Sequence, residues 1–126
     1  MNILICEDDP SFALNLSLTL KHNKVGYVTI ANDGKQAIAL IRSGKFDLII
    51  SDLHMPEAPG EKVIEYVRGM KSAVPIVVIT SDTEEIVVQR LREIGATEVI
   101  DKKVPTEQII KTLSKLMAKR RFLTPE

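Results

Sequence analysis

The segment NILICEDDP (residues 2–10) decides the expected fold. Its apolar half, residues 2–6, is a short run rich in isoleucine and leucine, which is typical of a strand covered on both faces. Acidic residues follow at once, and the pair Asp9-Pro10 can cap and start a helix. The segment therefore predicts a buried strand that passes directly into a helix.

The rest of the sequence repeats this alternation of short apolar runs and longer amphipathic stretches. The expected strands are residues 2–6, 27–31, 46–51, 76–80 and 98–101. Beyond the helix that starts at Pro10, the expected helices are residues 34–42, 61–70, 84–94 and 107–119. Strict alternation predicts one parallel sheet with helices on both faces and right-handed crossovers.

The first helix is ambiguous, because leucines alternate strictly with polar residues over residues 14–20, a pattern typical of a strand. A helix is still expected, since a helix start precedes the stretch and parallel strands need a long crossover between them. Leu14 and Leu18 then form an exposed apolar pair on the outer face. The inner face would hold Phe12, Ala13, Leu16 and Leu20.

Composition narrows the class of protein. The 126 residues suit one domain, and 44% hydrophobic with 27% charged residues is a globular balance. Lys plus Arg and Asp plus Glu number 17 each, so charge gives no argument for nucleic acid or an anionic membrane. No apolar run approaches the ~18 residues of a membrane span, and the first residues do not resemble a signal peptide. The single cysteine, Cys6, fits a reducing, cytoplasmic setting as an inert buried thiol.

Polar residues gather where the expected strands end. The first strand ends in Glu7 and Asp8, the third in Asp52, the fourth in Thr80 and the fifth in Lys102. In a parallel sheet of this kind, sites form beyond the carboxyl ends of the strands. We therefore expect these side chains to converge on one rim.

Converging carboxylates need a cation. Two of them ~5 Å apart at an effective dielectric of ~20 repel by roughly 3 kcal/mol, and Lys102 alone cannot neutralise three. Oxygen-only ligands favour Mg²⁺, which commonly binds phosphate as well. A carboxylate beside such a metal can act as a nucleophile and form an acyl phosphate. Asp52 would then be phosphorylated, with Lys102 and the hydroxyl of Thr80 on phosphoryl oxygens.

With these residues in place, the chain resembles a response regulator receiver domain from residue 2 to about residue 119. The matching pieces are ILICEDDP, DLHMPEAPG, VVITSD and GATEVIDKK, in the expected order. The resemblance implies a doubly wound, flavodoxin-like α/β fold with five helices and a five-stranded parallel sheet of order 2-1-3-4-5. It implies a receiver domain over residues 1–119, with residues 120–126 as a tail or the start of a linker.

The resemblance assigns a metal site for Mg²⁺ or Mn²⁺. Asp8 corresponds to a direct ligand and Glu7 to the other acid of the pair, which often binds through water. Asp52 corresponds to the phosphoacceptor and contributes to the same site. The main-chain carbonyl of His54 would supply a further ligand. Asp9 is interpreted as a helix N-cap rather than as a ligand.

The resemblance also assigns the groups around the phosphoryl site. Thr80 corresponds to the switch hydroxyl and Ser81 to the small residue that follows it, although a turn hydroxyl bonded to its own backbone is the alternative for Thr80. Lys102 corresponds to the lysine that pairs with phosphate. In the family, the positions of His54 and Asp82 often influence the lifetime of the acyl phosphate.

Three positions depart from the family pattern. Lys103 stands where a proline usually follows the lysine in a cis peptide, so a trans bond and an altered loop are expected. Val99 stands where many members carry Tyr or Phe, so no aromatic ring can report phosphorylation from that strand. Ala58-Pro59 occupies the turn before Gly60 and stiffens the loop after the phosphoacceptor.

The resemblance implies a phosphoacceptor switch in a two-component or phosphorelay system, rather than a turnover enzyme. Asp52 would take a phosphoryl group from the phosphohistidine of a histidine kinase or histidine phosphotransfer protein, which Leu14 and Leu18 would contact. A degenerate receiver acting as a phosphorylation-independent scaffold is the alternative. An aspartyl-phosphate phosphatase usually needs a second acid two residues on, where this chain has His54.

The resemblance places the response surface on the last two helices and the last strand. The expected residues there are Val88, Arg92, Lys103 and Lys111. It allows a phosphorylation-dependent dimer, while the sequence names neither a downstream protein target nor a fused output domain. Neither direct nucleic-acid binding nor membrane insertion is expected, because no recognition motif accompanies the basic residues 119–121.

Overall fold

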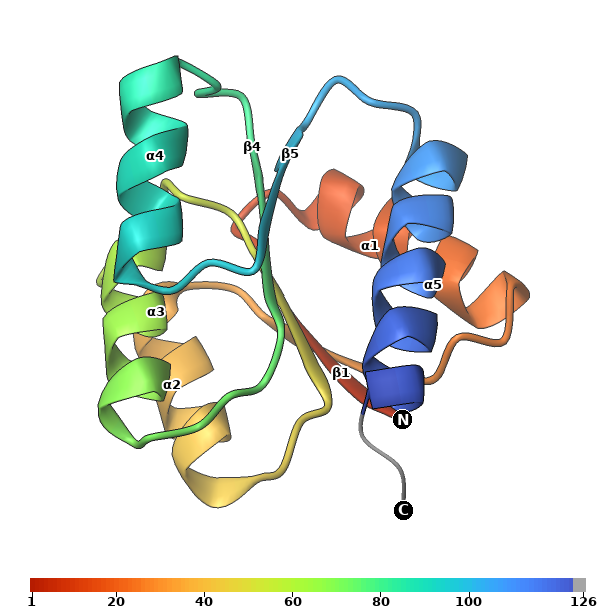
Figure 1. Ribbon diagram of the computed structural model, residues 1–126, viewed down its shortest axis with the longest axis horizontal. Helices are drawn as coiled ribbons and strands as arrows, with labels where there is room; N and C mark the ends of the chain where they lie inside the picture. The colour runs from red at the N-terminus through yellow and green to blue at the C-terminus, as the bar shows by residue number, and fades with distance from the viewer. Residues whose placement is uncertain (124–126) are drawn as a thin grey trace.

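The computed structural model describes the backbone of residues 1–123 and the side chains of residues 1–119. Five strands alternate with five helices in this part of the chain, as Figure 1 shows. The strands are β1 (Asn2–Cys6), β2 (Tyr27–Ala31), β3 (Leu48–Ser51), β4 (Ile76–Thr80) and β5 (Glu98–Asp101). The helices are α1 (Pro10–His22), α2 (Gly34–Ser43), α3 (Gly60–Gly69), α4 (Glu85–Ile94) and α5 (Thr106–Leu123).

The strands form one parallel sheet in the order β2-β1-β3-β4-β5, which confirms the predicted fold. Strand β1 pairs with β2 on one side and with β3 on the other. Cys6 is the register partner of Ser51, so the residues that follow β1 and β3 emerge side by side. This crossover point is where sheets of this type form their sites.

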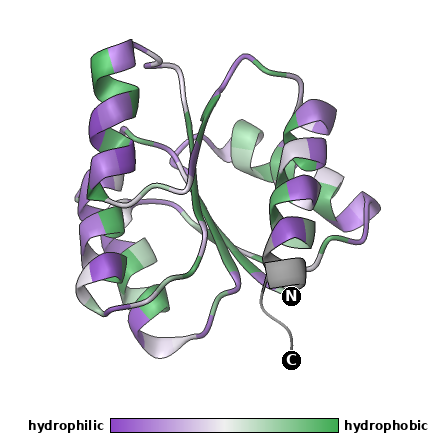
Figure 2. Ribbon diagram, in the orientation of Figure 1, coloured by the Kyte–Doolittle hydropathy of each residue, from purple (hydrophilic) through white to green (hydrophobic). Residues whose placement is uncertain are grey.

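Alternating side chains on the strands build two apolar layers. Ile3 and Ile5 of β1 face the cluster beneath α1 and α5, whereas Leu4 and Cys6 face the cluster beneath α2, α3 and α4. Figure 1 shows the same division of the helices between the two faces of the sheet. Hydrophobic residues concentrate along the sheet and hydrophilic ones on the outer helix surfaces in Figure 2.

The ambiguous leucine-rich stretch is a helix, as predicted. Leu16 and Leu20 are buried, whereas Leu14 and Leu18 are 56% and 54% exposed. The side chain of Asp9 caps the helix by accepting hydrogen bonds from the backbone N–H groups of Ser11 and Phe12. These contacts confirm Asp9 as the N-cap.

Two predicted boundaries differ from the structure by more than one residue. Strand β3 begins at Leu48 rather than at residue 46, because its first register partner in β1 is Ile3. Phe46 precedes the ladder and packs half-buried against the cluster beneath α2 and α3. Helix α5 continues past residue 119 to Leu123. The side chains of residues 120–123, and all of residues 124–126, belong to the predicted tail and lie outside the described part.

Among the residues that the structure describes, no helix has both the length and the apolar character needed to cross a bilayer.

Candidate functional site

Three carboxylates converge beyond the ends of β1 and β3. Oxygen atoms of Glu7, Asp8 and Asp52 all lie within 4.8 Å of one another. Glu7 is buried, with 3% of its surface exposed, whereas Asp8 is exposed. The sequence predicted this convergence because the acids follow the ends of parallel strands, and the structure confirms it. The site offers only oxygen ligands, which suit a hard divalent cation.

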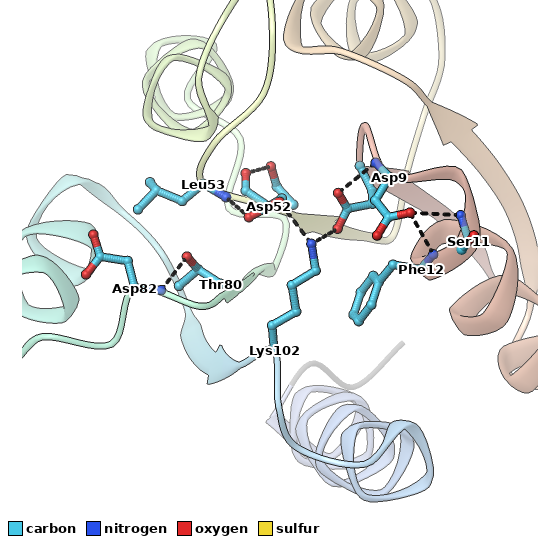
Figure 3. Close-up of polar contacts among 10 residues, drawn as sticks. Asp9, Ser11, Phe12, Asp52, Leu53, Thr80, Asp82 and Lys102 are labelled. Atoms are coloured by element: carbon cyan, nitrogen blue, oxygen red, sulfur yellow. Dashed lines mark hydrogen bonds and ion pairs between the residues drawn. The ribbon is translucent and has the colours of Figure 1, made fainter.

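Lys102 reaches into this acidic cluster from the turn after β5. Its Nζ lies 2.7 Å from Oε1 of Glu7 and 3.2 Å from Oδ2 of Asp52. The backbone N–H of Lys102 donates to the carbonyl of Thr80, which fixes where the side chain starts. Figure 3 shows the ammonium group of Lys102 next to Asp52, with the ring of Phe12 beside it. One ammonium therefore contacts both a buried acid and the predicted phosphoacceptor.

Burial is the main influence on the pKa of Glu7 in the cluster. Burial raises the pKa of Glu7 to about 7, even though Lys102 and the N–H of Asp9 stabilise its charged form. For Lys102, burial lowers the pKa, but the hydrogen bond to Glu7 and the charges of Asp52 and Glu7 outweigh this, so the pKa is raised. Glu7 therefore binds a proton more readily than an exposed glutamate does, and Lys102 stays protonated. A bound cation would replace the proton on Glu7.

Asp52 is held by hydrogen bonds from both sides. Its backbone N–H donates to the carbonyl of Cys6, and its Oδ1 accepts from the N–H of Leu53 at 2.7 Å. The loop that follows returns so closely that a Cβ on Gly60 would lie 2.3 Å from the carbonyl oxygen of Asp52. Only glycine fits there. Oδ2 of Asp52 accepts from Lys102 and points to the centre of the cluster.

Thr80 is fully buried at the end of β4, and its Oγ1 accepts a hydrogen bond from the N–H of Asp82 at 3.1 Å. This is the local turn contact that the sequence left open as the alternative for Thr80. Because Oγ1 accepts this bond, its proton stays available to donate. The switch role of Thr80 stays a prediction.

The rim of the site is formed by two loops. Ser81 is exposed on the loop after β4. His54, on the loop after β3, is also exposed, and its Nε2 lies 3.9 Å from Oδ2 of Asp82. The imidazole thus faces the second loop across the edge of the site. This geometry places both residues on the rim.

The turn after Lys102 shows how the missing proline is accommodated. No peptide bond among the described residues is cis, as expected for the Lys102–Lys103 link. The N–H of Lys103 donates to Oδ1 of Asp101 at 2.9 Å, and the N–H of Val104 donates to the carbonyl of Asp101. A proline could not make the first of these bonds. Val99 is half-buried and packs toward the cluster beneath α4.

The residues predicted as a response surface lie on α4, on α5 and in the turn after β5. Arg92 pairs with Glu98 at 2.9 Å, and Val88 is half-buried on the same helix. Lys103 and Lys111 are exposed. The structure leaves this surface as a prediction.

Phe12 is the site residue that the sequence did not single out. Its ring centroid lies 4.6 Å from Nζ of Lys102, close enough for a cation–π contact. The helical pattern had placed Phe12 on the inner face of the first turn, directly after the acidic pair. That position was the available sign that its ring would lie near the site.

Comparison with known proteins decides the family. The sequence model of the response regulator receiver domain matches residues 3–114. The chain belongs to the response regulator receiver domain family. The transcriptional regulatory protein ZraR of Escherichia coli K12 is 30% identical to this receiver domain over 94% of this chain and 26% of its own length. The two-component response regulator ARR2 of Arabidopsis thaliana is 30% identical over 96% of this chain and 18% of its own.

Solved structures agree with this assignment. The chemotaxis response regulator CheY4 of Vibrio cholerae superposes with a TM-score of 0.82 at 32% identity, covering 90% of this chain and 96% of that one. A CheY-like receiver domain protein of Methanospirillum hungatei gives a TM-score of 0.89 at 20% identity, over 98% of each chain, and shows the fold alone. The chain spans less than a third of the first relatives' lengths.

Proposed function

We propose that this receiver domain accepts a phosphoryl group on Asp52 from a phosphohistidine and that the phosphorylated form switches the binding of a partner. The observation that carries the proposal is the contact of Lys102 with Asp52 beside two further carboxylates. A surface aspartate that merely ends a strand has no need of this arrangement. The protein acts as a switch rather than as a turnover enzyme.

The transfer is a displacement at phosphorus. An Oδ of Asp52 attacks the phosphorus and forms the O–P bond, while the P–N bond to the donor imidazole breaks and its electron pair stays on that nitrogen. Lys102 then donates to a phosphoryl oxygen, and the proton of the Thr80 hydroxyl to another. Oδ1 of Asp52 keeps its bond from Leu53, which holds the carboxylate in place as Oδ2 changes partner.

The acidic cluster fits Mg²⁺ or Mn²⁺. Oxygen atoms of the three carboxylates lie within 4.8 Å of one another, and oxygen-only ligands suit these hard cations. Asp8, Asp52, Glu7 and the main-chain carbonyl of His54 would hold the ion. When bound, it supplies positive charge to the oxygens of the transferred group.

The partner surfaces follow from exposure and from the family. Response regulator receiver domains interact with histidine kinases or phosphotransfer proteins. The exposed pair Leu14 and Leu18 lies on α1, the helix that follows Glu7 and Asp8, and would supply apolar area for such a phosphodonor. The response surface on α4, β5 and α5 would bind a downstream partner or a second copy of the chain. With its single buried thiol, the protein is expected to act in the cytoplasm.

Intact mass spectrometry tests the proposal. Wild type with Mg²⁺ and a small phosphodonor should gain one phosphoryl group, and this gain should be absent without the metal and absent in Asp52→Asn. Asp47→Asn is the matched control, because Asp47 is an exposed carboxylate at the opposite end of β3. No gain in wild type, under conditions that label an active receiver domain, would contradict the proposal and favour the scaffold.

A further inference from the structure

Lys102 has a third neighbour besides its two carboxylates. The ring of Phe12 lies 4.6 Å from Nζ, at a distance typical of cation–π contacts, and Figure 3 shows it beside the lysine side chain. We propose that Phe12 is a positioning residue for Lys102 in the transfer to Asp52. The inference rests on the proposed function and adds a residue to it.

The two carboxylates cannot hold the ammonium by themselves throughout the transfer. Oδ2 of Asp52 now accepts from Lys102, but an oxygen of this carboxylate becomes the nucleophile. Glu7 lies at 2.7 Å, but it is also a proposed metal ligand. Both contacts therefore change during the reaction. The phenyl ring is neither a nucleophile nor a metal ligand, so its contact with the ammonium can persist.

Phe12 is itself firmly placed. Its N–H donates to the capping carboxylate of Asp9, which fixes the first turn of α1, and its half-buried ring packs against the cluster beneath α1 and α5. Lys102, in contrast, stands on a flexible four-carbon stem, so the position of its ammonium depends on what surrounds it. A fixed ring beside a flexible lysine limits the volume that the ammonium explores.

Phe12→Leu tests this role, because leucine keeps an apolar side chain and removes the π face. Phe12→Tyr should retain the contact. Phe46→Leu is the matched control, since Phe46 is also half-buried but packs on the other side of the sheet, against the cluster beneath α2 and α3. The rate of Asp52 phosphorylation by a small phosphodonor, at saturating Mg²⁺, is followed by intact mass.

Phe12→Leu should slow phosphorylation about 3- to 10-fold, while Phe12→Tyr and Phe46→Leu should stay within about twofold of wild type. The side-chain protons of Lys102 beside the ring provide a second readout by NMR. Their ring-current shift should be present in wild type and Phe12→Tyr, and lost in Phe12→Leu.

Three results would overturn the inference. Phe12→Leu could react at the wild-type rate, Phe46→Leu could slow the reaction equally, or Phe12→Tyr could behave like Phe12→Leu. If the wild-type protein is phosphorylated and any of these results is found, the proposed function stays in place and only the role of Phe12 is removed. A wild type that takes up no phosphoryl group overturns the proposed function, and the inference with it.

Discussion

Helices α1 and α4 both follow a strand whose end carries site residues, but they are attached to the sheet differently. α1 buries four residues and is capped by Asp9. α4 buries only Leu91, and no side chain caps its N-terminus. Beyond that leucine, α4 packs half-buried Val87 and Ile94 against the core. Ion pairs also join Arg90 to Glu61 and Arg92 to Glu98. Exposed pairs of this kind contribute only about 0–1 kcal/mol each.

The two ends of α4 also differ from each other. At its C-terminal end, the guanidinium of Arg68 donates to the carbonyl of Gly95 through Nε and Nη2. Its first turn follows the loop after Thr80 and exposes 74% of Ile86. The helix beside the acids is thus fixed, whereas the helix behind the predicted switch hydroxyl is fixed at one end. The proposed transfer site thus lies beside the helix that buries more residues, and the proposed response surface includes the helix that buries fewer.

The strongest test of this difference compares buried and exposed apolar residues on the two helices. Leu16→Ala in α1 removes a side chain that is 1% exposed and should lower the free energy of unfolding by about 2–5 kcal/mol. Ile86→Ala in α4 should change it by less than about 0.5 kcal/mol. Urea denaturation measures both. Equal losses would show that α4 is packed as firmly as α1.

The second test is the pH dependence of stability, because Glu7, a buried carboxyl, lies just before α1. The pKa of Glu7 is raised from 4.5 to about 7 in the fold, so between these values the native state binds more protons than the unfolded chain. The metal-free protein should therefore be most stable below pH 4.5 as far as Glu7 is concerned. Its free energy of unfolding should fall by up to about 3 kcal/mol as the pH rises to 7.

A control for the pH dependence of stability is available at the start of α4. Glu7→Gln should flatten the fall, whereas Glu84→Gln, which alters an exposed carboxylate before α4, should leave it unchanged. Urea denaturation in the presence of a chelator at several pH values gives the slope. A stability that rises over this interval in wild type would contradict the electrostatic account of the cluster.

The third test concerns the outer face of α1. Replacing Leu14 and Leu18 together by Asp should slow transfer from the cognate phosphodonor protein at least about tenfold, because apolar contact area is lost. Labelling by a small phosphodonor should be spared, since neither side chain belongs to the acidic cluster. Equal loss in both assays, or no loss in either, would remove the docking role of the pair.

The smallest expected effect concerns the caps. Asp9→Ala removes the hydrogen bonds to Ser11 and Phe12 and should destabilise the protein by about 1 kcal/mol. Glu84→Ser offers α4 the cap that it lacks and should stabilise that helix by about 0.5–1 kcal/mol. Hydrogen exchange of the first turn of each helix measures both changes. Slower exchange in α4 of the serine variant, with slower switching, would sharpen the contrast between the helices.

The sequence by itself determined the features that depend on local pattern. Apolar runs and amphipathic stretches predicted the order of strands and helices. A strand buried on both faces gives a continuous apolar run, whereas a helix buried on one face gives apolar residues at a helical period. The cap at Asp9 and the exposure of Leu14 and Leu18 followed from helical geometry. The acids at the strand ends could be placed on one rim, because parallel strands end on the same side.

Only the tertiary structure decided how those residues meet. Two contacts join elements that are distant in sequence: the ring of Phe12 lies beside Lys102, and Arg68 donates hydrogen bonds to the carbonyl of Gly95. The burial that raises the pKa of Glu7 likewise depends on packing. The true start of β3 also depended on its register with β1. These features rest on distances of a few ångströms set by strand register and side-chain packing, and sequence periodicity carries no information about such distances.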